Sequence, residues 1–191
     1  GNVSLYNKGL AKLYQILHYC EISSMYLIEP TKEYDKSWKE AMKEFGLEGT
    51  DGFWNYPEKP TSLDSYIQCT KSQASGRNLP DGFVPATTYW LIVKDKFVGH
   101  VNIRHALNEK LKRVGGHIGY AIRPPRRTKG YGIKILELAL QKAKELGLER
   151  VLLTCDESNT ASRKIIEENG GKFESSVLGK NGPALRYWIE L

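Results

Sequence analysis

A short glycine-containing segment, Arg126-Arg127-Thr128-Lys129-Gly130-Tyr131-Gly132, lies between a β-rich run and a long helical pattern. The run before it spans Gly116 to Ile122 and stops at Pro124-Pro125, and the helix is predicted from Gly130 to Leu146. The first turn of a helix carries unpaired N–H groups and a partial positive charge, and glycine lets a ligand approach the backbone closely. With three basic side chains beside it, this strand-to-helix junction predicts a binding site for a diphosphate.

Other phosphate-binding motifs are absent from the sequence. Neither G-x-x-x-x-G-K-[ST] nor G-x-G-x-x-G occurs, so the P-loop and the dinucleotide-binding fingerprint do not apply. The G-x-G of Gly130 and Gly132 gains weight from the strand before it, the two prolines, the basic residues and the long helix that follows. The junction is therefore a specific prediction rather than a chance pair of glycines.

The apolar periodicity predicts helices that interleave with strands only in part. The element order from Met25 to Leu191 is β-α-α-β-β-β-α-β-α-β-β, which predicts an α/β (α+β) chain built on a mixed sheet. The predicted strands span residues 25–29, 87–93, 97–103, 116–122, 151–154, 173–178 and 184–191. The predicted helices span residues 34–45, 62–72 and 130–146, and a further helix begins at Asn159 or Thr160.

The chain length of 191 residues suits one domain, or one domain with an extension. Met25 stands at the start of the first predicted strand, so residues 25–191 are expected to form a single domain. Residues 1–24 are then expected to be an N-terminal extension or a remnant of cloning, with the spacing of a short amphipathic helix over residues 10–17.

Charge and cysteine usage narrow the class of protein. The formal net charge of +6 favours anionic partners, among them nucleotides, nucleic acids and membrane surfaces. The three cysteines lie far apart without a C-x-x-C pair, which favours a reducing compartment. No apolar run of about 18 residues and no signal peptide is recognisable. The sequence therefore predicts a cytoplasmic protein without a membrane partner.

The pattern Arg127-x-x-Gly130-x-Gly132 resembles the acetyl-CoA loop motif, [Q/R]-x-x-G-x-[G/A], of the Gcn5-related N-acetyltransferase (GNAT) superfamily. The element order from Met25 to Leu191 is also similar to that of the superfamily. Further likeness to a poorly characterised bacterial branch lies in Gly115-Gly116-His117-Ile118-Gly119-Tyr120, in Thr154-Cys155-Asp156, and in Asn159-x-x-Ser162 followed by Gly170-Gly171. The resemblance implies the GNAT-like acyl-CoA N-acyltransferase fold, with acetyl-CoA as the cosubstrate and no metal.

The resemblance also implies roles for the matching positions. Ile122 would offer backbone groups to the pantetheine arm, at the point where its strand splays from the strand over 151–154. The N–H groups from Thr128 to Gly132 would hold the diphosphate, and Asn159 and Ser162 would lie beside the pantetheine or the departing thiol. The implied coenzyme-A-binding residues are Ile122, Arg127, Thr128, Lys129, Gly130, Tyr131, Gly132, Asn159 and Ser162.

The implied activity is acetyl transfer to a primary amine of a small molecule or peptide, by direct attack in a ternary complex. An amine with a pKa of about 10.4 must first lose a proton at neutral pH. His117 and His105 are candidate bases, because an imidazole has a suitable pKa. His117 has the opposite strand parity to Ile122, so a β-bulge would have to reset its direction. The loops over 49–61, 73–86 and 104–114 are expected to shape the acceptor pocket.

In many relatives, a tyrosine seven residues after the asparagine protonates the departing thiolate, and here that position is Ile166. Tyr120 and Tyr187 are candidate substitutes. Tyr120 also begins the stretch whose backbone N–H groups are expected to stabilise the oxyanion. Direct attack needs no covalent enzyme intermediate, so Cys155 is predicted to be a packed core residue.

Two other functions are compatible with some of these residues. The missing tyrosine favours a module of the same fold that binds acyl-CoA without turnover. A local basic cluster would also suit nucleic acid: Arg123, Arg126, Arg127, Lys129 and Lys134. No recognition-helix, zinc-finger or RNP-type pattern occurs, so no nucleic-acid partner is predicted. The spacing of His100, His105 and His117 matches no standard metal-ligand pattern. A homodimer is compatible with the sequence.

Overall fold

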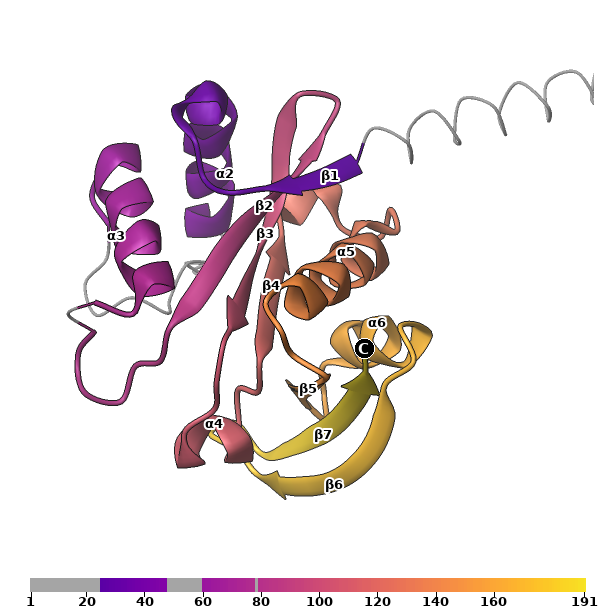
Figure 1. Cartoon of the computed structure of the whole chain (residues 1–191). Helices are drawn as coiled ribbons and strands as arrows, with labels where there is room; N and C mark the ends of the chain where they lie inside the picture. Colours follow the sequence, from indigo (N-terminus) through magenta and orange to yellow (C-terminus); the bar gives the residue numbers. More distant parts are fainter. Residues whose placement is uncertain (1–24, 48–59, 78) are drawn as a thin grey trace, which may run out of the picture.

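The structure, a computed structural model, describes residues 25–47, 60–77 and 79–191 (Figure 1). The expected extension over residues 1–24, with its amphipathic pattern, and most of the loop over 49–61 lie outside the described residues. None of the helices in the described part of the chain is long and apolar enough to cross a membrane.

The observed elements follow the predicted order. The strands are β1 (Met25–Ile28), β2 (Ala86–Val93), β3 (Lys96–Arg104), β4 (Ile118–Ile122), β5 (Arg150–Asp156), β6 (Lys172–Leu178) and β7 (Pro183–Glu190). The helices are α2 (Asp35–Leu47), α3 (Leu63–Ser75), α4 (Glu109–Arg113), α5 (Tyr131–Glu145) and α6 (Thr160–Glu168), with 3-10 turns η1 (Lys32–Tyr34) and η2 (Pro124–Arg126). The short helix α4, inside a segment expected to be a plain connection, and the two 3-10 turns are the additions to the predicted elements.

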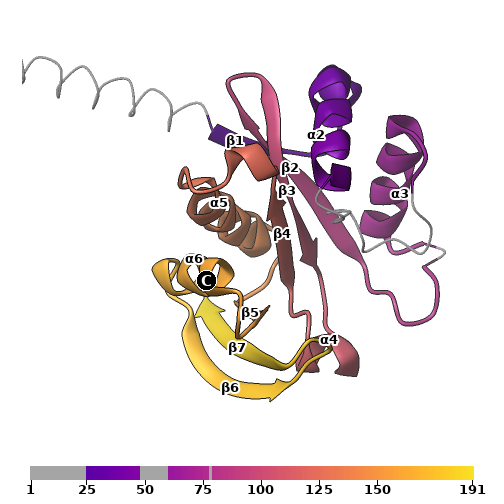
Figure 2. The same ribbon diagram turned by 180° about the vertical axis from the view of Figure 1, so that it is seen from behind.

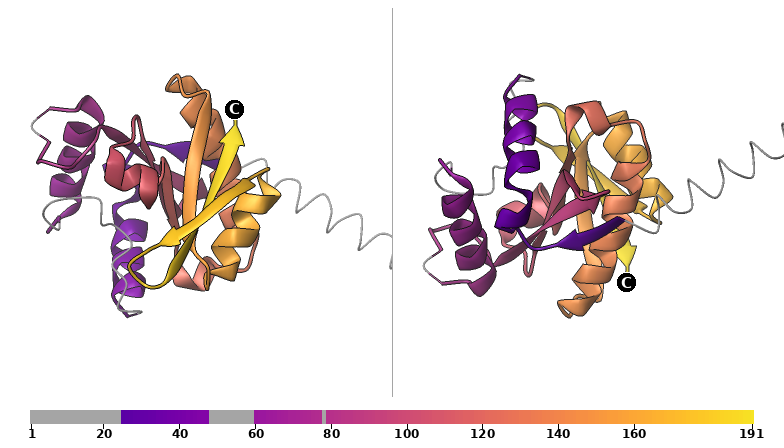
Figure 3. Two further views of the ribbon diagram at one scale, coloured as in Figure 1. Left: turned by 90° about the horizontal axis from the view of Figure 1, so that it is seen from below. Right: turned by 90° about the horizontal axis from the view of Figure 1, so that it is seen from above.

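The strands form two sheets, with orders β1-β2-β3-β4 and β5-β7-β6. Every strand pair in the described residues is antiparallel. The predicted α+β class is confirmed. The expected mixed sheet is wrong, because β4 and β5, which α5 connects, lie in different sheets and the described strand pairs are all antiparallel. Helices α2 and α3 cover one face of the first sheet, and α5 covers the other with α6 beside it (Figures 1 and 2). The views from below and above in Figure 3 place α2 and α3 on the side away from α6.

Strand alternation explains how one sheet supports two cores. Leu91 of β2 and Val101 of β3 are fully buried in the cluster that contains Ile135 of α5. Their neighbour Trp90 points to the opposite face and is fully buried in the cluster under α2 and α3. Successive side chains of a strand point to opposite faces, so each strand of the first sheet supports both helical layers.

Local chemistry fixes the ends of several elements. Lys94 and Asp95, with φ of 48° and 55°, form the two-residue turn between β2 and β3. Positive φ at both central residues is the signature of the turn type whose twist matches that of paired strands. Ser62 and Ser65 form a reciprocal capping box at the start of α3. The turn connects β2 and β3 within the first sheet, and the capping box stabilises the start of α3.

The two sheets meet where β4 and β5 begin. The backbone N–H of His117 donates to the Leu152 carbonyl (2.7 Å), and the Leu152 N–H donates to Nδ1 of His117 (2.9 Å). A Cβ at Gly116 would collide with the Leu152 carbonyl, so only glycine permits this close approach. Beyond this point β4 and β5 belong to different sheets. Strand β4, which ends at Ile122, therefore diverges from β5 and leads into the glycine-containing loop.

Candidate functional site

The loop after β4 has the geometry of an anion site. Thr128 and Gly130 have φ of 61° and 81°, and Gly130 is the N-cap of α5. Turns of this kind aim successive N–H groups into one concavity. No side chain of the described residues caps the helix at Gly130, so the N–H groups of its first turn remain available to a ligand. The predicted helix start is correct to within one residue, because α5 begins at Tyr131.

Side chains around the loop either brace it or extend from it. Nε of Arg127 donates to the carbonyl of Ile122 (3.1 Å), which folds the loop back onto the end of β4. Thr128, Lys129 and Gly130 are exposed. An added Cβ at Gly130 would meet no described atom within 4 Å, so the space in front of this glycine is open. Thr128, Lys129 and Gly130 therefore lie together on the exposed part of the loop, whereas Tyr131 is buried.

The two glycines of the motif have different local roles. A Cβ at Gly132 would collide with the Ile165 side chain, so this glycine allows α5 and α6 to pack closely. Tyr131, between them, is buried in the larger core. Gly132 therefore places α6, and with it the residues of the next site, against the loop helix.

The start of α6 lies beside β4. The Asn159 side chain accepts a hydrogen bond from the Ser162 N–H (3.0 Å) and caps the helix. The Ser162 hydroxyl is 2.9 Å from the Tyr120 hydroxyl. Burial raises the pKa of Tyr120 to about 12, although the hydrogen bond to Ser162 works in the opposite direction. Tyr120, Asn159 and Ser162 are thus brought together, and Tyr120 and Ile122 face the same side of β4.

His117 has a structural environment. Its Nδ1 accepts the Leu152 N–H, and its ring lies near the Trp188 ring with 6.3 Å between centroids. Burial first, and then the guanidinium groups of Arg104 and Arg150, lower the pKa of His117 to about 4. The strand parity of His117 is not reset, so its ring does not join Tyr120 and Ile122 on the α6 side of β4.

His105 lies just beyond the end of β3 that is remote from Ile122. The register pairs Ala86 with Arg104 at one end of β3 and Gly99 with Ile122 near the other. Nε2 of His105 is 2.8 Å from the Thr87 hydroxyl, and burial lowers the pKa of the ring. The structure therefore separates both histidines from the pairing of Tyr120 with Ser162.

The position of the usual tyrosine is occupied by a core residue. Ile166 lies one turn after Ser162 on α6, is 1% exposed and belongs to the larger hydrophobic cluster. Tyr187, the other candidate substitute, donates to Glu167 Oε1 (3.2 Å) and is also buried. Of the two tyrosines considered, Tyr120 is the one hydrogen-bonded to a predicted cofactor-site residue.

Sequence reasoning missed the fate of Arg123. This residue belongs to the basic cluster that would suit nucleic acid, yet it is 3% exposed and hydrogen-bonded to Glu44. Lys134 is also paired, with Glu137 at 2.8 Å. No periodicity or motif in the sequence indicates the contact between Arg123 and Glu44, since the two residues are 79 positions apart. Within the described residues, no group of three or more His, Cys, Asp or Glu side chains could hold a metal ion.

A match to a known family identifies the class of protein to which this chain belongs. Residues 30–172 match the family described as acetyltransferase (GNAT) domain, which is most of the chain, and the protein therefore belongs to the GNAT family. No curated protein sequence matches the chain.

Solved structures share this fold at low sequence identity. The microcin C7 self-immunity acetyltransferase MccE, in complex with acetyl-CoA and AMP, has a TM-score of 0.65 and 16% identity, with 88% of this chain and 93% of that chain covered. The acetyl transferase from Salmonella typhimurium that modifies the N-terminal serine of 50S ribosomal subunit protein L7/L12 has a TM-score of 0.61 and 13% identity, covering 88% and 95%. The aminoglycoside acetyltransferase AAC(6')-Ib in complex with coenzyme A has a TM-score of 0.60 and 14% identity, covering 87% and 95%.

Proposed function

We propose that this protein is an N-acetyltransferase that moves an acetyl group from acetyl-CoA to a primary amine of a small molecule or peptide. The observation that carries the proposal is the uncapped, glycine-opened start of α5 at the end of the strand that leaves β5. Family membership supports acetyl transfer in general. The relatives of known structure include one that modifies a protein N-terminus and one that acetylates aminoglycosides, which supports an amine acceptor.

The loop residues fit a coenzyme A diphosphate. Gly130 leaves open space at the start of α5, and its left-handed backbone turns the following N–H groups outward. The Arg127 side chain braces the loop against Ile122, and Lys129 adds an exposed positive charge. In this proposal the backbone from Thr128 to Gly132 binds the diphosphate, as the N-terminus of a helix does for other anions.

The pantetheine arm is assigned to the opening between β4 and α6. One edge of β4 is paired with β3, and its other edge separates from β5 after His117. Backbone groups on the free edge of β4, other than the Ile122 carbonyl that accepts Arg127 Nε, would then bind the amide groups of the arm. Asn159 and Ser162 border the same opening from α6. When bound, acetyl-CoA supplies the thioester whose acyl group is transferred.

Tyr120 is the proposed hydrogen-bond donor at the reacting end. A phenol with a pKa of about 12 keeps its proton at neutral pH. A thiol has a pKa of about 8.5, so complete proton transfer from Tyr120 to a thiolate would be uphill by several pKa units. Tyr120 therefore acts by directing the proton on Oη toward developing negative charge, without transferring it. Ser162 holds the phenol in place through its 2.9 Å contact.

The geometry favours structural roles for the two candidate bases. His117 has a pKa of about 4 and one ring nitrogen engaged by β5, and His105 is bound to Thr87 at the remote end of β3. We therefore place neither as the base in this proposal. The acceptor amine reaches its neutral form by loss of a proton to solvent before attack on the thioester.

Ile166 favours one alternative, a module of the same fold that binds acyl-CoA without turnover. A coupled assay of thiol release across a panel of amines and N-terminal peptides separates the two functions. The proposed enzyme binds acetyl-CoA in calorimetry and releases thiol only when a suitable amine is present. Binding without thiol release for any amine would support the module, and failure to bind acetyl-CoA would overturn both.

A further inference from the structure

Arg123 connects the predicted diphosphate loop to the opposite side of the first sheet. It is the residue directly after Ile122, and its side chain is 4% exposed. Its backbone N–H donates to the Val98 carbonyl (2.9 Å), and its carbonyl accepts the Arg126 N–H (2.8 Å). The first residue after β4 is therefore fixed to β3 on one side and begins η2 on the other.

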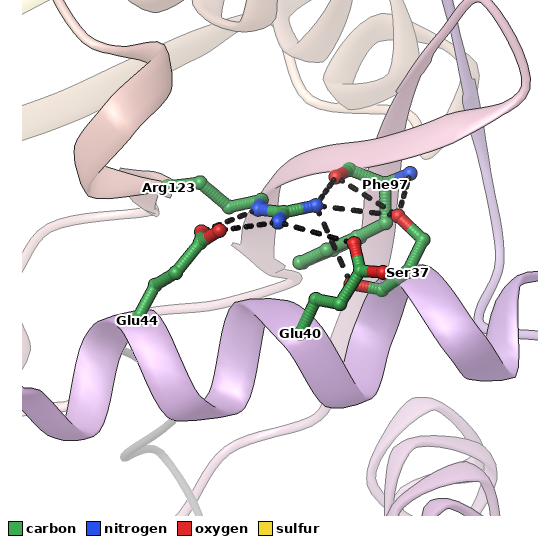
Figure 4. A network of polar contacts seen from close by, with 5 residues as sticks. All are labelled: Ser37, Glu40, Glu44, Phe97 and Arg123. Carbon is green, nitrogen blue, oxygen red and sulfur yellow. Dashed lines mark hydrogen bonds and ion pairs between the residues drawn. The ribbon is translucent and has the colours of Figure 1, made fainter.

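The guanidinium of Arg123 is hydrogen-bonded to residues of α2 and β3 (Figure 4). Nε and NH2 donate to the two carboxylate oxygens of Glu44, at 2.7 and 2.6 Å. NH1 donates to the Phe97 carbonyl (2.9 Å) and to the hydroxyl of Ser37 (3.3 Å) and its carbonyl (3.4 Å). A two-pronged arginine–carboxylate pair fixes orientation as well as distance. The pair therefore fixes the position of the start of η2 relative to α2.

This arrangement removes Arg123 from direct contact with any phosphate. Its nitrogens point to α2 and to the β3 backbone, and its charge is neutralised by Glu44. Glu40 approaches NH2 at 3.7 Å and is half exposed, so it contributes charge without a hydrogen bond. A role for Arg123 in anion binding would then have to pass through the backbone of the loop.

We propose that Arg123 and Glu44 are positioning residues for the coenzyme A loop, and that they set the place of its N–H groups from the far side of the sheet. The inference rests on the proposed function, because it concerns the same loop. Preorganised donors bind well only when their supporting contacts fix them to within a fraction of an ångström. Loss of the paired hydrogen bonds between Arg123 and Glu44 would let η2 and the loop shift together. Only Pro124-Pro125 and Arg126 separate Arg123 from Arg127.

Glu44→Gln distinguishes a role of the Arg123 charge from a positioning role, because the two roles predict opposite changes in the affinity for coenzyme A. If Arg123 acted through its charge, removal of the Glu44 carboxylate would release it toward the phosphates and tighten coenzyme A binding. If Arg123 acts by position, the same change weakens binding, and we expect the Kd for coenzyme A to rise about tenfold. Glu40→Gln is the matched control, because it removes an equal charge beside the same guanidinium and leaves the paired hydrogen bonds between Arg123 and Glu44 intact.

A purely structural effect is distinguished by kinetics. In Glu44→Gln the KM for acetyl-CoA should rise about tenfold while kcat at saturation stays within about twofold of the wild type. A variant that was only partly folded would instead lose kcat in proportion and keep its KM. Circular dichroism well below the melting temperature checks the folded fraction of each variant.

The outcomes separate this inference from the proposed function. Weaker coenzyme A binding in Glu44→Gln, with Glu40→Gln close to wild type, supports the positioning role. Unchanged or tighter binding in Glu44→Gln overturns it and leaves the proposed function standing. A wild-type protein that does not bind coenzyme A overturns both.

Discussion

The phenolic oxygen of Tyr120 lies 2.9 Å from the hydroxyl oxygen of Ser162 and joins β4 to the first turn of α6. Tyr120 comes from the strand that precedes the loop helix, and Ser162 from the helix that follows β5. The family's usual tyrosine position on that helix holds Ile166, which is buried in the core. The Tyr120 hydroxyl therefore reaches the start of α6 from β4.

Tyr120→Phe tests whether this hydroxyl takes part in the reaction. Loss of one preorganised donor should lower kcat by about tenfold to a hundredfold, with little change in the Kd for coenzyme A. Steady-state thiol release measures kcat, and calorimetry measures the Kd. Tyr187→Phe is the control, because it removes a phenol that is bonded to Glu167 and should leave kcat within about twofold. An unchanged kcat in Tyr120→Phe would remove this residue from the mechanism.

Gly130→Glu should abolish coenzyme A binding while the fold survives. The change adds a negative charge at the start of α5, where a diphosphate is proposed to bind, and it strains a residue with a φ of 81°. The strain costs about 1 to 2 kcal/mol. Gly147, at the other end of α5, has a φ of 86° and also has no described atom within 4 Å of an added Cβ. Gly147→Glu is thus a matched control for strain, and calorimetry should show coenzyme A binding in that variant alone.

The pKa of His117, lowered to about 4 from 6.5, predicts loss of stability in acid. The unfolded chain binds a proton at this residue below about pH 6.5, whereas the folded protein does so only below about pH 4. Acid therefore favours the unfolded chain between these values, by about 2 kcal/mol at pH 5 for this group. Chemical denaturation from pH 7 to pH 4 should show a decline that is shallower in His117→Gln.

Activity at neutral pH provides the second readout for His117→Gln. A glutamine can still accept the Leu152 N–H, so the junction of β4 and β5 is retained. If His117 is structural, kcat at neutral pH should fall by less than about threefold. A fall of a hundredfold or more, with the loss of a titration in the pH profile, would restore His117 as the general base.

Much of the fold could be predicted from local patterns. The helical spacing and strand alternation place α2, α3, α5, the start of α6 and the β2–β3 hairpin to within a few residues. The start of α5 is predictable because glycine, the prolines and the basic residues all mark the same boundary. Helix α4 was missed because it is five residues long and begins with a local cap, in which Asn108 accepts the Leu111 N–H (2.9 Å). No apolar face of α4 is buried, so periodicity gives no signal.

The contacts that define the site are of a different kind. The bonds between Tyr120 and Ser162 and between Arg123 and Glu44 join residues 42 and 79 positions apart. Strand parity alone could have placed Tyr120 on the same face as Ile122, but not opposite Ser162. The charge of Arg123 was visible in the sequence, whereas its neutralisation depends on how α2 packs against β3. Local sequence patterns therefore predict the loop, whereas tertiary packing determines which side chains lie beside it.

Cys155 provides a test of direct attack without a covalent enzyme intermediate. The thiol is 7% exposed, and burial raises its pKa, so at neutral pH it is a protonated and weak nucleophile. Cys155→Ala should keep kcat/KM within about threefold of the wild type and cost about 1 kcal/mol of stability through lost packing. Cys69→Ala, on α3 and only half-buried, is the control for a general effect of removing a thiol. Intact mass after incubation with acetyl-CoA alone should show unmodified protein. An acetyl adduct that disappears in Cys155→Ala, together with lost turnover, would instead require a thioester on the enzyme and a two-step reaction.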